Sequence, residues 1–121
     1  MKWVVGYPPG GATDIIARLI GQRLSEKLGQ QFIIENRAGA GGTAGALVAS
    51  RQANDGSYFF VGAAHHAIAP SLYPRLDYNI ETDFIPVAVI AQPPQIIVVN
   101  PRRVPARTLP ELIALAKSKP D

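Results

Sequence analysis

The feature that most constrains the fold is the alternation of short apolar runs with stretches of helical periodicity. Apolar runs at residues 3–7, 31–35 and 57–62 have the length and composition of buried strands. Between the first two, apolar residues from 15 to 28 recur at helical spacing. A second helix is expected from Thr43 to about Gln52. This β-α-β-α-β order predicts the α/β class, with a parallel sheet covered by helices.

Three loops follow these strands, and in open α/β sheets ligands bind at that carboxyl edge. The first loop, residues 7–13, contains two prolines and two glycines, so no strand or helix can run through it. The second loop, residues 36–43, contains three glycines, and the third covers residues 63–66. Bare glycine turns at helix N-termini offer backbone N–H groups to an anion. The loops therefore predict half of an anion site, although each could also be only a turn.

Residues that can cap helices stand at each expected helix end. Thr13 and Thr43 are expected N-caps, and Gly29 is an expected C-cap. Asp14, on the first turn, has two interpretations. It either caps the helix and organises the loop, which we favour for a simple carboxylate ligand, or it pairs with a ligand ammonium group.

The C-terminal third is less regular. A short helix is expected at residues 67–73, broken at Pro70, and two strands at residues 84–91 and 95–99. Thr108 and Glu111 form a capping box that opens a helix extending to Lys119. That helix has no apolar partner in the sequence, which suggests a truncated chain.

Composition excludes several functions. The chain of 121 residues suits one domain with a modest core, and its net charge is +3. Its one basic cluster, at positions 102, 103 and 107, is too short to indicate nucleic-acid binding. Without cysteine, disulfides and thiolate chemistry are excluded. No apolar run approaches the roughly 18 residues of a membrane span, and no signal peptide is recognisable.

Catalytic and cofactor motifs are weak. The stretch GAGGTA (39–44) fits a loose dinucleotide-binding pattern, but the next strand lacks the acidic residue expected at its end. A Rossmann-like enzyme fragment therefore stays the alternative. His65 and His66 are adjacent and have no obvious third metal ligand or nucleophile, so we expect one to pack and the other to face the cleft.

The loop sequences, taken together, resemble the Bug family, the substrate-binding proteins of tripartite tricarboxylate transporters. The resemblance is carried by YPPGGATD (7–14), ENRAGAGG (35–42) and HAIAPSLY (66–73), with further matches at DFIPVA (83–88) and VVNP (98–101). It implies a type II periplasmic-binding-protein fold of two lobes that close on a small organic carboxylate or amino acid. It implies no cofactor, no catalysis, no nucleic acid, a periplasmic location and membrane carrier subunits as partners.

The resemblance also assigns parts of this chain. Residues 1–95 are expected to be an incomplete first lobe, and 96–121 the crossing strand and first helix of the second. Such a fragment is expected to bind ligand poorly and to self-associate as a dimer. Ala63 and Ala64 stand where the family often has serine or threonine. The implied ligand contacts are Tyr7, Gly11, Ala12, Thr13, Asp14, Ala40, Gly41, Gly42, Thr43, Ala64, His65 and His66.

These assignments lead to one prediction from the sequence about the glycine loops. A bulky side chain at Gly11 or Gly42 should block the backbone amides and abolish carboxylate binding with little loss of fold.

Overall fold

The computed structural model describes residues 1–94 and 96–119. It divides into two units, Met1–Ala91 and Gln92–Asp121, which are described separately below.

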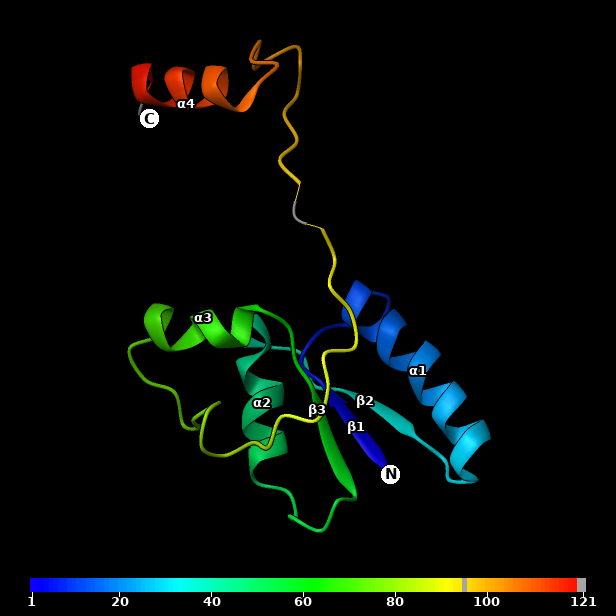
Figure 1. Ribbon diagram of the computed structural model, residues 1–121. Coiled ribbons are helices and arrows are strands. Elements are labelled where there is room, and N and C mark those ends of the chain that lie inside the picture. The colour runs from blue at the N-terminus through cyan, green and yellow to red at the C-terminus, as the bar shows by residue number, and fades with distance from the viewer. Residues whose placement is uncertain (95, 120–121) are drawn as a thin grey trace. The chain divides into compact units, whose positions relative to one another are not determined.

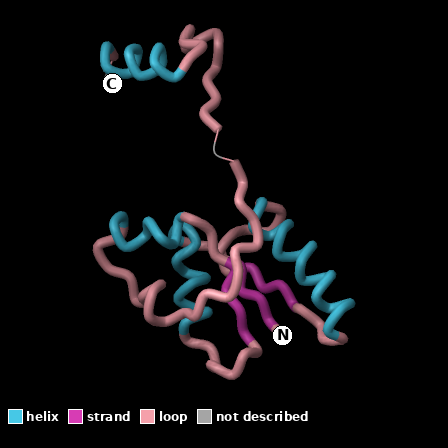
Figure 2. Tube along the Cα trace, in the orientation of Figure 1, coloured by secondary structure: helices cyan, strands magenta, loops and turns pink. Residues whose placement is uncertain are grey.

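The first unit is built on a parallel three-stranded sheet. Its strands are β1 (Lys2–Val5), β2 (Ile33–Asn36) and β3 (Tyr58–Val61), in the order β2-β1-β3 (Figures 1 and 2). Val5 lies opposite both Asn36 and Val61, so the three carboxyl ends are level. This arrangement confirms the predicted α/β class and brings the three following loops to one edge.

Helices cover both faces of this sheet. In Figure 1 the sheet lies between α1 (Ala12–Leu28) and α2 (Thr43–Ser50). A short 3₁₀ turn, η1 (Ala40–Gly42), leads into α2, and α3 (His65–Leu72) follows β3. The helix α3 begins two residues earlier than expected and continues through Pro70, which was expected to break it.

The core forms where α1 meets the sheet. Its buried members are Trp3, Val5, Ala17 and Val61, and the edge of Phe32 contacts Trp3 at 5.5 Å between ring centroids. The apolar stripe predicted for α1 is only partly buried. Its packed face is centred on Ala17 and Gly21, whose small size allows close approach, whereas several larger apolar side chains of the stripe are exposed: Ile15, Leu19 and Leu28.

In the first unit, two predicted caps are wrong and one is confirmed. Gly11 and Gly42 take the N-cap positions of α1 and α2, so Thr13 and Thr43 lie inside the helices. The Thr43 hydroxyl instead donates to the carbonyl oxygen of Ala40 at 2.8 Å. Gly29 is the predicted left-handed C-cap of α1, and its N–H donates to the carbonyl of Ser25.

The two later strands are not formed. Residues 84–91 are irregular, as are 96–99, while Gln95 lies outside the described residues. Ile85, Val87 and Val89 are largely exposed. A strand needs a hydrogen-bonded neighbour, and within the described residues the sheet contains only β1, β2 and β3.

The second unit contains α4 (Leu109–Ser118). Its predicted cap is confirmed, because Thr108 Oγ1 accepts the N–H of Glu111 at 3.4 Å. The carboxylate of Glu111 in turn accepts the N–H of Arg107 at 2.8 Å. Within the described parts of both units, no helix combines the length and apolarity needed to cross a membrane.

Candidate anion-binding site

The second glycine loop and the start of α2 touch the end of β1 backbone to backbone. A Cβ placed on Gly6, just after β1, would lie 2.6 Å from the carbonyl oxygen of Gly42. A Cβ on Gly45, in the first turn of α2, would lie 2.5 Å from the Cα of Gly6. Only residues without a side chain permit this approach, which brings the start of α2 against the end of β1.

The first turn of α1 presents unpaired backbone donors. The helical ladder begins with the N–H of Ile15, which donates to the carbonyl of Gly11 at 3.0 Å. Within the described residues, the N–H groups of Ala12, Thr13 and Asp14 have no acceptor, as expected for a helix start. Ala12 is exposed and Thr13 is partly exposed, so an anion can reach this turn.

The second loop presents a smaller set of donors. Ala40, Gly41 and Gly42 all have positive φ angles, of 45°, 65° and 95°. This turn directs the N–H of Gly42 to the carbonyl of Gly39 and the N–H of Thr43 to that of Ala40. Those two amides are therefore used internally. The N–H groups of Ala40 and Gly41 have no acceptor in the part of the chain that the structure describes.

His66, from the third loop, is the histidine that packs. Its ring is 2% exposed and stands edge-on to Tyr7, with 5.8 Å between centroids. Nε2 lies 3.2 Å from the carbonyl oxygen of Gly42, and Nδ1 lies 3.1 Å from the nitrogen of Ala63. If Ala63 donates to Nδ1, then Nε2 carries the proton and donates to Gly42. His66 thus joins the third loop to the second.

His65 faces the second loop instead. A Cβ on Gly41 would lie 2.8 Å from His65 Nε2 and 2.6 Å from the hydroxyl oxygen of Tyr73. His65 Nε2 is buried and has no hydrogen-bond partner among the described residues. Ala64 is exposed and stands at the N-cap of α3. The sequence predicted that one histidine packs and the other faces the cleft; His66 is the one that packs, and His65 lies beside the second loop.

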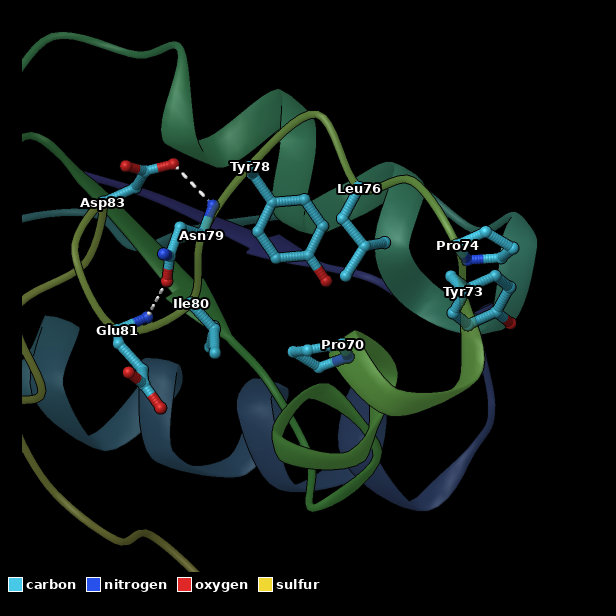
Figure 3. A pocket seen from close by; sticks show the side chains of 9 residues that line it. All are labelled: Pro70, Tyr73, Pro74, Leu76, Tyr78, Asn79, Ile80, Glu81 and Asp83. Atoms are coloured by element: carbon cyan, nitrogen blue, oxygen red, sulfur yellow. Dashed lines mark hydrogen bonds between the residues drawn. The ribbon is translucent and has the colours of Figure 1, made fainter.

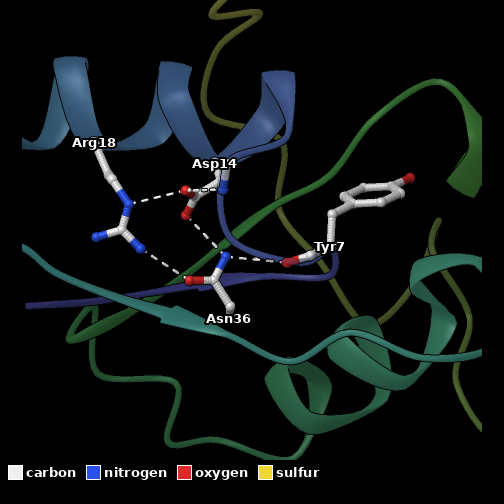
Figure 4. A network of polar contacts seen from close by, with 5 residues as sticks. Tyr7, Asp14, Arg18 and Asn36 are labelled. Carbon is white, nitrogen blue, oxygen red and sulfur yellow. Dashed lines mark hydrogen bonds and ion pairs between the residues drawn. The ribbon is translucent and has the colours of Figure 1, made fainter.

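Asp14 organises the first loop. It is 2% exposed, and its Oδ2 accepts the N–H of Gly10 and the Nε–H of Arg18, both at 2.9 Å (Figure 4). Its Oδ1 accepts the amide of Asn36 at 2.8 Å. The hydrogen bond from Arg18, followed by those from Gly10 and Asn36, holds the pKa of this carboxyl well below its usual range. Asp14 is therefore a charged organiser of the loop, as favoured from the sequence, but it does not cap the helix, because Gly11 is the N-cap of α1 and no side chain caps it.

Asn36 completes this network, and sequence reasoning did not single it out. Its Nδ2 donates to the carbonyl of Tyr7 at 3.0 Å as well as to Asp14, and its Oδ1 accepts from Arg18 Nη2 at 3.0 Å. The polar residue at the last position of an apolar strand, just before a glycine loop, was the available signal. Asn36 therefore fixes both ends of the first loop to β2.

Tyr7 lies where the first and third loops meet. Burial raises the pKa of its phenol, and nearby Tyr78 raises it further. Tyr7 therefore stays protonated at neutral pH and keeps its hydroxyl as a donor. Within the described residues, no group of three or more His, Asp or Glu side chains is placed to hold a metal ion.

A separate hollow lies beyond α3, and none of the predicted site residues lines it (Figure 3). Its volume is about 570 Å³. Tyr78 points its buried hydroxyl toward the space beside Leu76 and Pro70, and this hydroxyl has no partner among the described residues. Tyr73 turns its own hydroxyl away from Tyr78 (Figure 3).

Comparison with known proteins decides the family. A sequence model of the tripartite tricarboxylate transporter family receptor, TctC, matches residues 16–121. The chain belongs to this family. BugT of Bordetella pertussis is 35% identical to this TctC-family chain over 122 residues, covering 99% of the chain and 37% of BugT. A UPF0065 protein from the tcbD-tcbE intergenic region of Pseudomonas sp. strain P51 is 37% identical over 120 residues, covering 99% of the chain and 35% of that protein.

Solved structures agree with the family. Rpa4515 of R. palustris, solved with adipate, is 38% identical with a TM-score of 0.83, covering 98% of this chain and 40% of that one. MatC of Rhodopseudomonas palustris, solved with bound malate, is 34% identical with a TM-score of 0.78, covering 100% and 41%. These matches confirm both the resemblance and the periplasmic-binding-protein fold. The TctC-family chain spans 35% to 41% of the length of these four relatives.

Proposed function

We propose that this chain forms the carboxylate-gripping part of a solute-binding protein that captures a small organic anion for a tripartite tricarboxylate transporter. The proposal depends on one observation: two glycine turns bring unpaired N–H groups to one edge of the sheet. Ala12, Thr13 and Asp14 supply these groups from the first loop, and Ala40 and Gly41 supply them from the second. Hydrogen bonds from such amides to a carboxylate are charge-assisted and contribute about 1.5–3 kcal/mol each.

The proposal extends to the organisation of the whole protein. We assign residues 1–95 to the first lobe and 96–121 to the crossing segment and first helix of the second. We also propose a periplasmic location and membrane carrier subunits as partners, and membership of the family supports both. One solved relative, BugD, is described as a periplasmic binding protein and is 36% identical to this chain.

Binding without catalysis fits the polar groups at the site. The proposed contacts are backbone amides, the Tyr7 hydroxyl, His65 and Tyr73, none of which stands beside an activated nucleophile. The matching family is described as a transporter receptor, BugD as a periplasmic binding protein, and MatC was solved with bound malate. We therefore propose reversible capture of the carboxylate, with no bond made or broken.

Calorimetry on the protein as its gene encodes it tests this function. The titrants are malate, adipate, citrate and NAD, followed by mass analysis of each ligand after incubation. We expect one of the carboxylates to bind in a one-to-one ratio and to be recovered unchanged, and NAD not to bind. Binding of NAD alone, or conversion of the carboxylate, would overturn the proposal in favour of the enzyme alternative.

A further inference from the structure

Asp14 places a buried negative charge beside the amides proposed to bind a carboxylate. It occupies the first turn of α1, two residues after Ala12, and its side chain is 3% exposed. Buried charges interact more strongly than solvated ones because solvent screens them less. Left uncompensated, this carboxylate would repel an anionic ligand and attract an ammonium group.

Arg18 supplies the compensation. Its Nε lies 2.9 Å from Asp14 Oδ2, one helical turn away on the same face of α1. A guanidinium stays protonated at any physiological pH, so the pair carries no net charge. The Arg18 side chain is 51% exposed, which means that its charge can be removed by substitution without opening a cavity in the core.

The hydrogen-bonding capacity of Asp14 is also engaged by the protein. One oxygen accepts from both Gly10 and Arg18, and the other accepts from Asn36. These donors enclose the carboxylate in the network drawn in Figure 4. As long as Arg18 stays in place, a ligand ammonium group finds no free, charged acceptor here.

We propose that Arg18, acting through Asp14, sets the preference of the site for anionic ligands over ligands that carry an ammonium group. This inference rests on the proposed carboxylate-binding function and deepens it. Arg18 is a positioning residue, because it balances the charge of Asp14 and does not itself contact the ligand. Removing the guanidinium leaves the Asp14 charge unbalanced, which weakens binding of a dianion and strengthens binding of its amino counterpart.

The test compares Arg18→Gln with the unaltered protein, using ligand pairs that differ by an amino group. The pairs are malate with aspartate, and adipate with 2-aminoadipate, each measured by calorimetry. We expect the ratio of carboxylate affinity to amino-acid affinity to fall roughly fivefold or more in Arg18→Gln. A variant that only loosened the loop would weaken both ligands alike and leave this ratio unchanged.

Arg23→Gln is the matched control. Arg23 lies on the same helix and pairs with Glu26 at 3.1 Å, but both side chains of that pair are exposed. The ratio of carboxylate affinity to amino-acid affinity in Arg23→Gln should equal that of the unaltered protein. Arg18→Lys keeps the charge and should retain most of the preference, which separates charge from shape if Arg18→Gln folds poorly.

The outcomes separate the inference from the function on which it rests. If the unaltered protein binds no member of either pair and no citrate, the proposed function fails and the inference falls with it. If it binds a member of a pair but folded Arg18→Gln shows the same ratio, only the inference is overturned. If the ratio of carboxylate affinity to amino-acid affinity falls in Arg18→Gln and returns to its original value in the double variant Arg18→Gln with Asp14→Asn, both the proposed function and the inference are supported.

Discussion

Gly45 and Gly6 pack against each other through their backbones. A Cβ on Gly45 would lie 2.5 Å from the Cα of Gly6 and 2.9 Å from the carbonyl oxygen of Arg37. Backbone atoms cannot move aside as flexible side chains do, so this contact fixes how closely α2 approaches β1. The positions of the first and second loops relative to each other depend on it.

Gly45→Ala should therefore destabilise the fold even though alanine is the better helix former. We expect a loss of about 1–3 kcal/mol in the free energy of unfolding, measured by urea denaturation. Gly21→Ala in α1 is the matched control, because its Cβ would meet mainly the side chain of Ile34 at 3.3 Å. The free energy of unfolding of Gly21→Ala should be close to that of the unaltered protein, because the higher helix propensity of alanine offsets the mild crowding. Equal destabilisation of both variants would contradict the backbone contact.

Gly11→Val should weaken carboxylate binding without unfolding the protein. Gly11 has a φ of −76°, and its Cβ would meet only the carbonyl oxygen of Pro8, at 3.6 Å. Valine there covers the amides of the first turn, so we expect affinity to fall at least tenfold by calorimetry. Ala53→Val, in an exposed loop, should leave affinity unchanged. Full affinity in folded Gly11→Val would contradict the placement of the anion.

Gly42 does not permit the same experiment, contrary to the prediction from its sequence context. Its φ is +95°, and a Cβ would lie 3.1 Å from both His66 Nε2 and the Tyr7 ring. Substitution at Gly42 should therefore reduce stability as well as affinity, with a melting temperature several degrees lower. An unchanged melting temperature for Gly42→Val would restore the original prediction.

Tyr73→Phe should reduce carboxylate affinity at least tenfold. The Tyr73 hydroxyl and His65 Nε2 both lie over Gly41, whose N–H has no acceptor within the described residues. Loss of one hydrogen bond to an anion explains the size of the effect. Tyr78→Phe removes another hydroxyl, in the hollow of Figure 3, and should not change affinity. A common effect of the two variants would point to packing instead of ligand contact.

Asp14 should make the protein sensitive to acid. Its pKa in the folded state lies below the ordinary value of 3.8, so the unfolded chain binds more protons near that pH. The stability it contributes is complete above about pH 5 and declines as the pH falls below that value. In urea titrations at pH 7 and pH 3, Asp14→Asn should lose less stability between the two than the unaltered protein. An equal loss would exclude Asp14 as the source.

A polypeptide of these 121 residues alone should self-associate. In the described sheet, β2 and β3 each pair only with β1, and exposed outer edges invite a further strand. Ile85, Val87 and Val89 add an exposed apolar segment. Light scattering at micromolar concentration should report a dimer, and Val87→Lys with Val89→Lys should shift it toward monomer. A monomer of the unaltered chain that binds carboxylate fully would contradict this prediction.

The order of elements could be predicted from the sequence because periodicity and glycine loops are local signals. The N-caps of α1 and α2 could not; at the start of α1, for example, Gly11 and Thr13 are both plausible and packing decides between them. The strands expected at residues 84–91 and 95–99 are absent from the described residues 84–91 and 96–99 because a strand also depends on packing. Apolar composition favours a strand, but a strand forms only beside a partner, and local sequence does not contain the partner.

The candidate site was predicted to a similar extent. The glycine turns and both histidines carry recognisable sequence signals, and the structure brings their loops together. The partnership of Asp14 with Asn36 joins residues 22 positions apart. No local pattern specifies such a contact, because it depends on how β2 aligns beside β1. Local sequence also does not specify the contact between Tyr73 and Gly41, because it depends on the direction in which α3 runs.

Asn36 also has a consequence for folding. It is the last residue of β2 and lies opposite Val5 in the parallel pair with β1. A slip of one residue between these strands would turn its side chain to the other face of the sheet, away from Asp14 and from the carbonyl of Tyr7. Misaligned pairings of these four-residue strands would thus leave a buried carboxylate without its amide partner. The polar network that shapes the first loop therefore also favours the correct alignment of β1 and β2 over alignments shifted by one residue.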